Sequence, residues 1–171
     1  MLVHLLKKQN KNSLECLKEI LISDYKLSNI NFIKNEYGKP YLPNNEVCFN
    51  ISDSGDCIAI AISHSEVGVD IELIKERKRI DKIVSKTFKV SEQVEYNSSS
   101  NKIDYFYSIW TKKEAYVKMT GTGIVGYFNN LEDNYKDYVV TMKEKINDDN
   151  YYLSVSCLNK EERENIKIIY E

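Results

Sequence analysis

The sequence predicts an α+β domain built from helices and mainly antiparallel strands. Hydrophobic residues make up 42% of the 171 residues and charged residues 29%, so the chain can bury a core and fold as one domain. Strand patterns occur in both halves of the chain, and the strongest helical pattern covers residues 103–119. Because strands and helices do not alternate one by one, we favour antiparallel pairing over a doubly wound parallel sheet.

The first half, residues 1–75, is predicted to contain one helix followed by a small sheet. Apolar residues at helical spacing predict a helix over residues 12–26, with Ser13 as its cap. A turn is expected at Tyr37-Gly38-Lys39-Pro40. The predicted strands cover residues 31–34, 47–51, 57–63 and 67–72.

The second half, residues 76–171, is predicted to repeat this combination of helices and sheet. Helical patterns cover residues 82–88, 91–96 and 103–119. Strand patterns cover residues 138–145, 151–158 and 166–170, with a polar turn at residues 147–150. The last three strands are therefore expected to form the sheet of the second half.

Charge and cysteine content exclude several classes of protein. With 24 basic and 26 acidic residues the net charge is -2, which argues against a nucleic-acid-binding protein. The four cysteines form no C-x-x-C pair, which favours free thiols in a reducing compartment. The apolar run before Lys7 is too short for a signal peptide or a membrane span. We therefore expect a cytoplasmic protein without a membrane partner.

Three acidic residues and a lysine are spaced so that they can meet. Asp70 and Glu72 lie two apart in a predicted strand, so their side chains share one face. Glu114 and Lys118 lie four apart in a predicted helix, so they share one side. Carboxylates beside a lysine suit Mg²⁺ that holds a diphosphate. The spacing therefore predicts a magnesium and diphosphate site if this strand and this helix pack together.

Each of these pairs also has an ordinary structural explanation. Alternating acids commonly form the solvated face of a strand, and Glu114 with Lys118 would be a common surface pair on a helix. Two neighbours favour a site instead. Gly68 precedes the strand acids, as glycine often does at a turn or a close backbone approach. Trp110 lies one turn before Glu114, and a carboxylate beside packed aromatic rings needs a partner.

A glycine motif at residues 121–126 matches G-x-G-x-x-G. A dinucleotide-binding fingerprint requires a strand before the glycines and a helix after them. Here a predicted helix ends at Gly121, so we interpret these glycines as the end of a helix.

A serine hydrolase is the other reaction class that the sequence suggests. Ser52 and Ser54 end one predicted strand, and Ser63-His64-Ser65 ends the next. The chain has no G-x-S-x-G motif and only two histidines, so a catalytic triad has little support. We expect His64 to be a turn residue.

Five short motifs follow one another along the chain. They are Tyr37-Gly38-Lys39-Pro40, residues 49–55, residues 68–72, residues 88–92, and residues 110–118 followed by Gly121 and Gly123. In this order they resemble the 4′-phosphopantetheinyl transferases of the larger type, which activates surfactin synthetase. The resemblance runs from about Ser13 to the end of the chain, with a shortened N-terminus. It implies two similar helix-plus-antiparallel-sheet halves related by a pseudo-twofold axis, with coenzyme A bound between them.

The resemblance implies an activity that depends on Mg²⁺. The 4′-phosphopantetheine group of coenzyme A would pass to a serine of an apo acyl or peptidyl carrier protein, and 3′,5′-ADP would be released. Asp70, Glu72 and Glu114 would hold the metal together with the pyrophosphate of coenzyme A. Lys118 would stabilise the phosphate, and Glu114 or Glu92 would be the base.

The nucleotide end of coenzyme A is expected to lie near Lys39 and Ser52. The family usually has histidine after this serine, whereas this chain has Asp53, which would repel the 3′-phosphate unless a cation offsets it. We expect Lys7, Lys8 or Lys11 to replace cations of the longer N-terminus found in the family. Otherwise a second subunit would complete the sheet, so both a monomer and a homodimer are open.

Two alternatives to the transferase stay open. The first is a catalytically weak or inactive relative that binds carrier proteins or nucleotides as a partner. The second is a metal-dependent phosphohydrolase that uses the same acids. For the transferase, we expect an acidic carrier protein to dock near Lys112, Lys113 and Met119.

Overall fold

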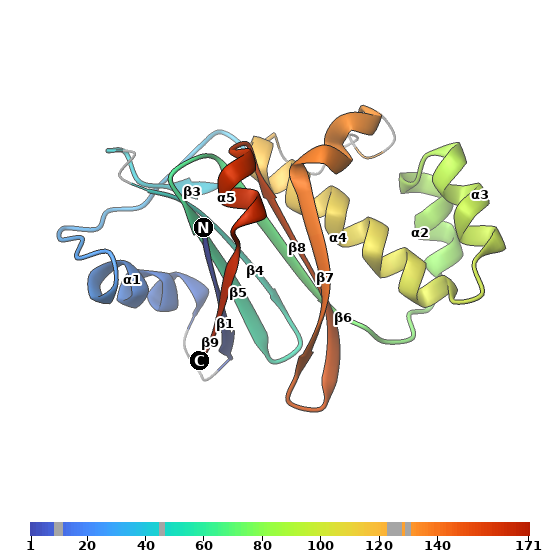
Figure 1. Ribbon diagram of the computed structural model, residues 1–171, viewed down its shortest axis with the longest axis horizontal. Helices are drawn as coiled ribbons and strands as arrows, with labels where there is room; N and C mark the ends of the chain where they lie inside the picture. Colours follow the sequence, from blue (N-terminus) through green and yellow to red (C-terminus); the bar gives the residue numbers. More distant parts are fainter. Residues whose placement is uncertain (9–11, 45–46, 123–127, 129–130) are drawn as a thin grey trace.

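Two packed sheets with helices on their outer faces make up the fold (Figure 1). The computed structural model describes residues 1–8, 12–44, 47–122, 128 and 131–171. Its helices are α1 (Ser13–Ser23), α2 (Ile80–Thr87), α3 (Val90–Ser98), α4 (Lys102–Thr120), α5 (Lys160–Glu164) and the 3-10 helix η1 (Asp133–Tyr138). Its strands are β1 (Leu2–Lys7), β2 (Ile33–Lys34), β3 (Pro40–Tyr41), β4 (Cys48–Ser54), β5 (Cys57–Ser63), β6 (Val67–Leu73), β7 (Val139–Ile146), β8 (Asp149–Cys157) and β9 (Lys167–Tyr170). The predicted α+β class is confirmed.

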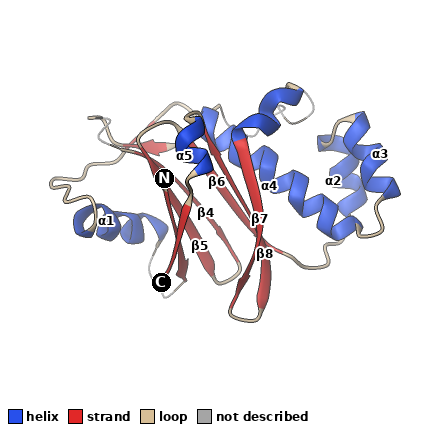
Figure 2. Cartoon of the chain, viewed as in Figure 1, coloured by secondary structure: helices blue, strands red, loops and turns tan. Residues whose placement is uncertain are grey.

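The first sheet has the strand order β4-β5-β1-β9 and the second has the order β6-β8-β7. Strands β2 and β3 form a separate short pair. Pairing is antiparallel except between β1 and β9, which run parallel. Helix α1 covers the outer side of the first sheet and α4 that of the second, while α2 and α3 lie at the far end (Figure 2). A pseudo-twofold relation between the two halves stays a prediction.

The core lies between the two sheets and depends on an alternation in β5. The small residues Cys57, Ala59 and Ala61 face β6 and β8, and they let the sheets approach closely. The larger residues of β5 turn the other way and pack beneath α1. These larger residues are Ile58, Ile60 and Ile62. Burying each isoleucine side chain stabilises the fold by about 2 kcal/mol.

The two ends of the chain complete the first sheet, which the sequence analysis did not predict. No strand was assigned within residues 1–11, yet β1 lies between β5 and β9. The last strand was expected in the second sheet, yet β9 pairs with β1. Both strands are short, and their apolar patterns do not indicate partners at the opposite end of the chain. The first sheet thus takes one strand from each end of the chain.

Helix boundaries follow local capping chemistry. Asn12, rather than Ser13, caps α1: its side chain accepts a hydrogen bond from the backbone of Glu15, whose carboxylate accepts one in return. Helix α4 ends where predicted, because Gly121 adopts a left-handed φ of 68° and its N–H donates to Val117. The remaining glycines of the G-x-G-x-x-G motif lie outside the described residues.

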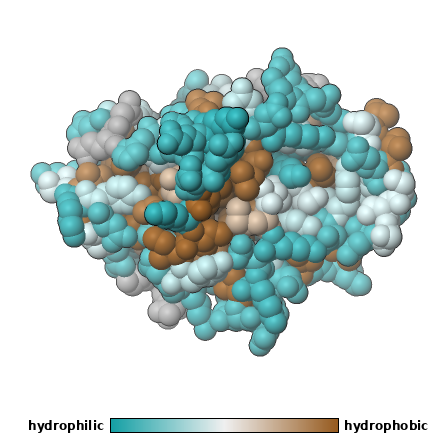
Figure 3. Space-filling model, in the orientation of Figure 1, coloured by the Kyte–Doolittle hydropathy of each residue, from teal (hydrophilic) through white to brown (hydrophobic). Residues whose placement is uncertain are grey.

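Within the described residues, no helix combines the length and apolar character needed to cross a membrane. The face seen in Figure 3 carries apolar side chains below α5, in the region where β9 and β7 approach each other. At this boundary the hydroxyl of Tyr170 donates to Glu144, so a polar contact links the two sheets. None of the four cysteines, all of which lie within the described residues, forms a disulfide.

Candidate functional site

Helix α4 presses directly on strand β6 at Gly68. A Cβ atom at this position would lie 2.0 Å from the carbonyl oxygen of Ala115 and 2.4 Å from the backbone nitrogen of Met119. No side chain fits in that space, which is the close backbone approach that the sequence indicated. Since Asp70 and Glu72 follow on the same face of β6, this contact places them under α4.

The structure brings the predicted acids and lysine together in one cavity of about 300 Å³. Asp70 and Glu72 enter it from β6, while Glu114 and Lys118 enter from α4. The opposite face of β6 carries Val69 and Ile71 into the core, so the alternation of the strand separates core from cavity. We call this space the acid cavity; it is lined by Ile51, Ser52, Asp53, Asp70, Ile71, Glu72, Trp110, Glu114 and Lys118.

Lys118 and Ser52 hold one oxygen of Asp70. The ammonium nitrogen of Lys118 lies 2.7 Å from Oδ1 of Asp70 and 2.9 Å from the hydroxyl of Ser52. That hydroxyl donates to the same Oδ1 over 2.9 Å. The other oxygen of Asp70, Oδ2, is buried and has no hydrogen-bond partner among the described residues. A buried carboxylate oxygen without a partner is a vacant acceptor for a cation or a donor group.

Burial raises the pKa of both Asp70 and Glu114. The pKa of Asp70 is raised to about 6 by desolvation, against the opposing effect of the Lys118 ammonium. The pKa of Glu114 is raised to about 7 by desolvation and then by the negative charge of Asp70. Both carboxyls therefore exchange protons near neutral pH, as a proton acceptor in a reaction site must.

The donor set fits a hard cation, although the side chains are not arranged around one. Among the described residues, no group of three or more His, Cys, Asp or Glu has the geometry of a metal site. The carboxylates of Asp70, Glu72 and Glu114 nevertheless line the acid cavity, and Oδ2 of Asp70 is vacant. Oxygen ligands of this kind are those that Mg²⁺ prefers.

Asp53 lies at the rim of the acid cavity and is already paired. The ammonium of Lys8 lies 2.6 Å from its carboxylate, and each side chain is about half exposed at 46% and 47%. Of the cations expected to replace the longer N-terminus, Lys8 thus offsets the charge of Asp53. Lys11 lies outside the described residues.

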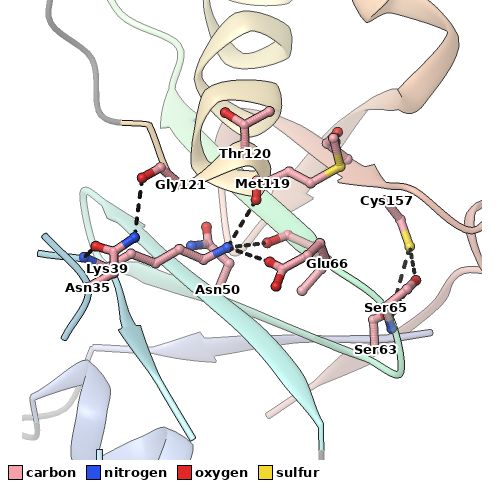
Figure 4. Close-up of polar contacts among 12 residues, drawn as sticks. Asn35, Lys39, Asn50, Ser63, Ser65, Glu66, Met119, Thr120, Gly121 and Cys157 are labelled. Atoms are coloured by element: carbon pink, nitrogen blue, oxygen red, sulfur yellow. Dashed lines mark hydrogen bonds and ion pairs between the residues drawn. The ribbon is translucent and has the colours of Figure 1, made fainter. Parts of the chain in front are cut away.

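Lys39 lies beside the acid cavity rather than in it. Its ammonium nitrogen contacts Glu66 and the carbonyl oxygen of Met119, each over 3.1 Å, so it ties the end of α4 to the start of β6 (Figure 4). Lys39 and Lys118 together line a neighbouring cavity of about 270 Å³. Lys39 also borders a third cavity of about 520 Å³. A row of cavities therefore leads from the acids past both lysines.

Glu92 lies outside the acid cavity, which corrects its assignment as a candidate base. Its side chain is almost fully buried and lies 2.6 Å from the ammonium of Lys113, which is itself buried. The backbone of Lys89 and the hydroxyl of Tyr135 also donate to Glu92. These contacts connect α3, α4 and η1. Glu92 and Lys113 therefore form a structural ion pair.

Two of the residues expected to dock a carrier protein are also buried. Lys113 donates to the carbonyl oxygens of Thr87 and Phe128, and Met119 packs against Ser156. Only Lys112 of the three retains partial exposure. Of these three residues, Lys112 alone can therefore contribute its side chain to a docking surface.

Two polar residues of β4 that contact β6 beside the acid cavity were missed. Ser54 donates to Glu72 over 3.1 Å, and Asn50 accepts from the backbone of Val69 over 3.0 Å. The sequence contained a signal, because Asn50, Ser52 and Ser54 alternate along one strand. Strand alternation gives the shared face but does not reveal which neighbour lies opposite it.

Comparisons with known proteins point to one family. Residues 66–150 match the sequence model of the 4′-phosphopantetheinyl transferase superfamily, and this segment includes the acids and lysine of the acid cavity. The chain is 38% identical over 118 residues to 4′-phosphopantetheinyl transferase gsp of Aneurinibacillus migulanus, covering 63% of this chain and 48% of that protein. It is 33% identical over 116 residues to 4′-phosphopantetheinyl transferase Sfp of Bacillus subtilis strain 168, covering 63% and 50%. It is 39% identical over 93 residues to 4′-phosphopantetheinyl transferase AcpT of Escherichia coli K12, covering 52% and 48%. The chain spans about half the length of these relatives.

Proposed function

We propose that this chain, which belongs to the 4′-phosphopantetheinyl transferase superfamily, transfers the phosphopantetheine group of coenzyme A to a serine of an apo acyl or peptidyl carrier protein. One observation carries the proposal: Asp70, Glu72, Glu114 and Lys118 meet in a single cavity, and all four lie in the segment that matches the family. Three carboxylates with a lysine suit a diphosphate substrate better than a peptide or an ester.

In the proposed reaction the carrier serine oxygen forms a bond to the β-phosphorus of the coenzyme A diphosphate. The bond from that phosphorus to the bridging oxygen breaks, and 3′,5′-ADP leaves with the electron pair. The proton of the serine passes to Glu114. Glu114 is the candidate for this role because its carboxylate enters the acid cavity from α4, on the same side of the helix as Lys118.

Lys118 is proposed to bind the diphosphate oxygens. Its ammonium already lies at the boundary between the acid cavity and the adjacent cavity, where it contacts Asp70 and Ser52. A fixed positive charge at this position stabilises the charge that develops on the leaving phosphate. The hydroxyl of Ser52 already contacts Asp70, Lys118 and the backbone N–H of Ile71. We therefore assign Ser52 to positioning Lys118 rather than to binding the nucleotide.

Asp70, Glu72 and Glu114 are the residues that would hold Mg²⁺. When bound there, the ion would neutralise charge on the diphosphate. Lys39 is proposed to bind the nucleotide end of coenzyme A, since it lies beyond Lys118 along the row of cavities. The cytoplasm remains the expected location of this reaction.

The dependence of 3′,5′-ADP release on a carrier protein distinguishes this transfer from hydrolysis. The chain should release 3′,5′-ADP from coenzyme A and Mg²⁺ only when an apo carrier protein is present. Replacing the acceptor serine of the carrier by alanine should abolish the release. Equal release without carrier would support the phosphohydrolase and contradict the transferase.

Asp53 favours a second candidate, a relative that binds its partners without turnover. Its carboxylate lies at the rim of the acid cavity, where its repulsion of a polyanionic substrate is offset by the pairing with Lys8. If the second candidate is correct, Asp53→His should create transfer activity in a silent protein. If the unchanged chain turns over and Asp53→His alters only its affinity for coenzyme A, the binding-only alternative is eliminated.

An exposed basic segment is the surface that we propose for the carrier protein. Residues 75–86 hold six basic and two acidic side chains in a chain whose net charge is -2. They form the loop before α2 and nearly all of α2 itself, at the end of the molecule opposite α1 (Figure 1). The basic side chains are all exposed, and they would attract an acidic helix. They are Lys75, Arg77, Lys78, Arg79, Lys82 and Lys86.

A further inference from the structure

Polar side chains of β4 replace the backbone pairing that would otherwise join the two sheets. Strand β4 ends the first sheet and β6 ends the second, and no backbone ladder connects them. Instead, the side chains of Asn50, Ser52 and Ser54 accept hydrogen bonds from backbone N–H groups of β6 over 3.0, 3.3 and 3.1 Å. The partners lie at a constant offset of 19 residues, so the contacts form a regular side-chain ladder.

The ladder satisfies donors that the fold leaves without a strand partner. The N–H groups of Val69, Ile71 and Leu73 point away from β8, toward β4. Leaving one such buried donor unpaired costs roughly 1–3 kcal/mol. A side chain between the two strands also holds them farther apart than the ~4.8 Å of backbone pairing. The acid cavity lies along this wider boundary.

Two members of the ladder also hold the acids. The hydroxyl of Ser52 donates to Asp70, and that of Ser54 donates to Glu72. In each case the hydroxyl oxygen accepts from the amide one residue after the acid, which fixes where its proton can point. Asn50 accepts an amide in the same way and contacts neither acid. A side chain of β4 can therefore bind the backbone of β6 without positioning a carboxylate, as Asn50 does.

We infer that Ser54 is a positioning residue for Glu72, which it orients toward a divalent cation in the acid cavity. Ser52 is not the residue to test, because Lys118 also contacts it and its loss would disturb several groups. Ser54 has only the amide of Leu73 and Glu72 as partners among the described contacts. The inference rests on the metal site of the proposed function. It goes beyond that function by identifying the Ser54 hydroxyl as the group that holds the carboxylate of Glu72 in place before the cation binds.

The test is the affinity of the full chain for Mn²⁺ alone, measured by calorimetry without coenzyme A or carrier protein. Ser54→Ala should weaken Mn²⁺ binding about 10-fold, which is the low end of the effect of groups that orient metal ligands. Ser54→Thr, which keeps the hydroxyl, should bind Mn²⁺ as the unchanged chain does. If Ser54→Ala fails to fold, Ser54→Cys tests the same point, because a thiol fills the space and donates weakly.

A matched control separates positioning from general destabilisation. Ser65 also donates to a carboxylate, that of Glu162, over 2.9 Å, but lies away from the acid cavity. Ser65→Ala should therefore lose a similar bond and leave Mn²⁺ affinity unchanged. Unchanged Mn²⁺ affinity in folded Ser54→Ala, or no Mn²⁺ binding by the unchanged chain, would overturn the inference.

The inference and the proposed function can fail separately. If Ser54→Ala weakens Mn²⁺ binding but the unchanged chain transfers nothing to any carrier, the inference stands and the transferase does not. If transfer proceeds and Ser54→Ala binds Mn²⁺ normally, the function stands and the positioning role of Ser54 does not.

Discussion

At the scale of single residues, the acid cavity concentrates negative charge that the fold only partly compensates. Asp70 has one oxygen held by Lys118 and Ser52 and another that is buried without a partner among the described residues. Glu114 lies close enough for the charge of Asp70 to raise its pKa further. Neighbouring carboxylates that are only partly compensated destabilise the folded state. A bound cation would compensate this charge, so the arrangement is expected of a cation-binding site.

The raised pKa values predict that the chain loses stability as the pH rises. The folded state binds protons at Asp70 and Glu114 more tightly than the unfolded state does. Their stabilising effect is therefore complete below about pH 4 and is lost as the pH passes through about 6 and 7. Glu114→Gln should reduce the loss between about pH 5 and about pH 8 by about 2 kcal/mol.

Urea unfolding of both proteins at the two pH values measures this effect. The pKa of Glu162 is instead lowered to about 2, so its contribution to the free energy of unfolding is lost only under strongly acid conditions. Glu162 therefore does not contribute to the difference in stability between the two pH values. Equal pH dependence in Glu114→Gln and the unchanged chain would show that Glu114 is ionised normally.

The sequence was sufficient to predict the residues whose geometry is local. Asp70 with Glu72, and Glu114 with Lys118, share faces by the periods of strand and helix alone. The roles of Ser54 and Glu92 could not be predicted from the sequence. Ser54 contacts Glu72 and Glu92 contacts Lys113, and each partner lies on another element. The periodicity of a strand or a helix does not specify such contacts.

At the scale of elements, the site depends on how closely α4 approaches β6. The sequence predicted both elements and the reason for Gly68 between them. It did not predict that β1 and β9 pair at the other side of the first sheet. Pairing between the two ends of a chain is a long-range choice, which short apolar segments do not encode on their own.

Gly68→Ala should destabilise the fold by about 3 kcal/mol, because the added Cβ would overlap backbone atoms of α4 that cannot move independently. Gly38→Ala is the matched control. Its Cβ would meet nothing within 4 Å, and only its left-handed φ of 86° makes alanine unfavourable, at about 1 kcal/mol. Urea unfolding gives both values. A smaller loss at Gly68 than at Gly38 would mean that α4 and β6 do not touch as described.

The buried pair of Glu92 and Lys113 should behave as a structural unit. Lys113→Met alone should cost about 3 kcal/mol or more, because it leaves a buried carboxylate without its cation. Adding Glu92→Gln should recover much of this loss, since glutamine can still accept from Lys89 or Tyr135. A double-mutant cycle of unfolding free energies measures the coupling.

The same double variant tests whether Glu92 acts in catalysis. Folded Glu92→Gln/Lys113→Met should keep its transfer rate, whereas Glu114→Gln should lose it. Loss of transfer in Glu92→Gln without any loss of stability would instead return Glu92 to the list of candidate bases.

At the scale of the whole molecule, the acid cavity lies at the boundary between two sheets, and charge is distributed unevenly around it. Side chains of β4, rather than a continuous backbone ladder, join the sheets at this boundary. The basic segment of residues 75–86 lies at one end of the molecule and α1 at the other (Figure 1). This asymmetry predicts the direction from which an acidic partner approaches.

Charge reversal at α2 should weaken the use of a carrier protein selectively. Lys82→Glu should raise the KM for an acidic apo carrier about fivefold and leave the affinity for coenzyme A unchanged. Lys18→Glu is the control, because Lys18 is equally exposed but lies on α1. Equal effects of the two variants would show that only overall charge matters, and no effect at Lys82 would place the docking surface elsewhere.

The most direct measurement of the central claim is the intact mass of the carrier protein. A panel of apo acyl and peptidyl carriers is incubated with the chain, coenzyme A and Mg²⁺, and each carrier is then weighed by mass spectrometry. We predict a gain of one phosphopantetheine group on at least one carrier, lost with chelator and in Glu114→Gln. A folded chain that binds coenzyme A yet modifies no carrier would contradict the transferase and favour the binding-only relative.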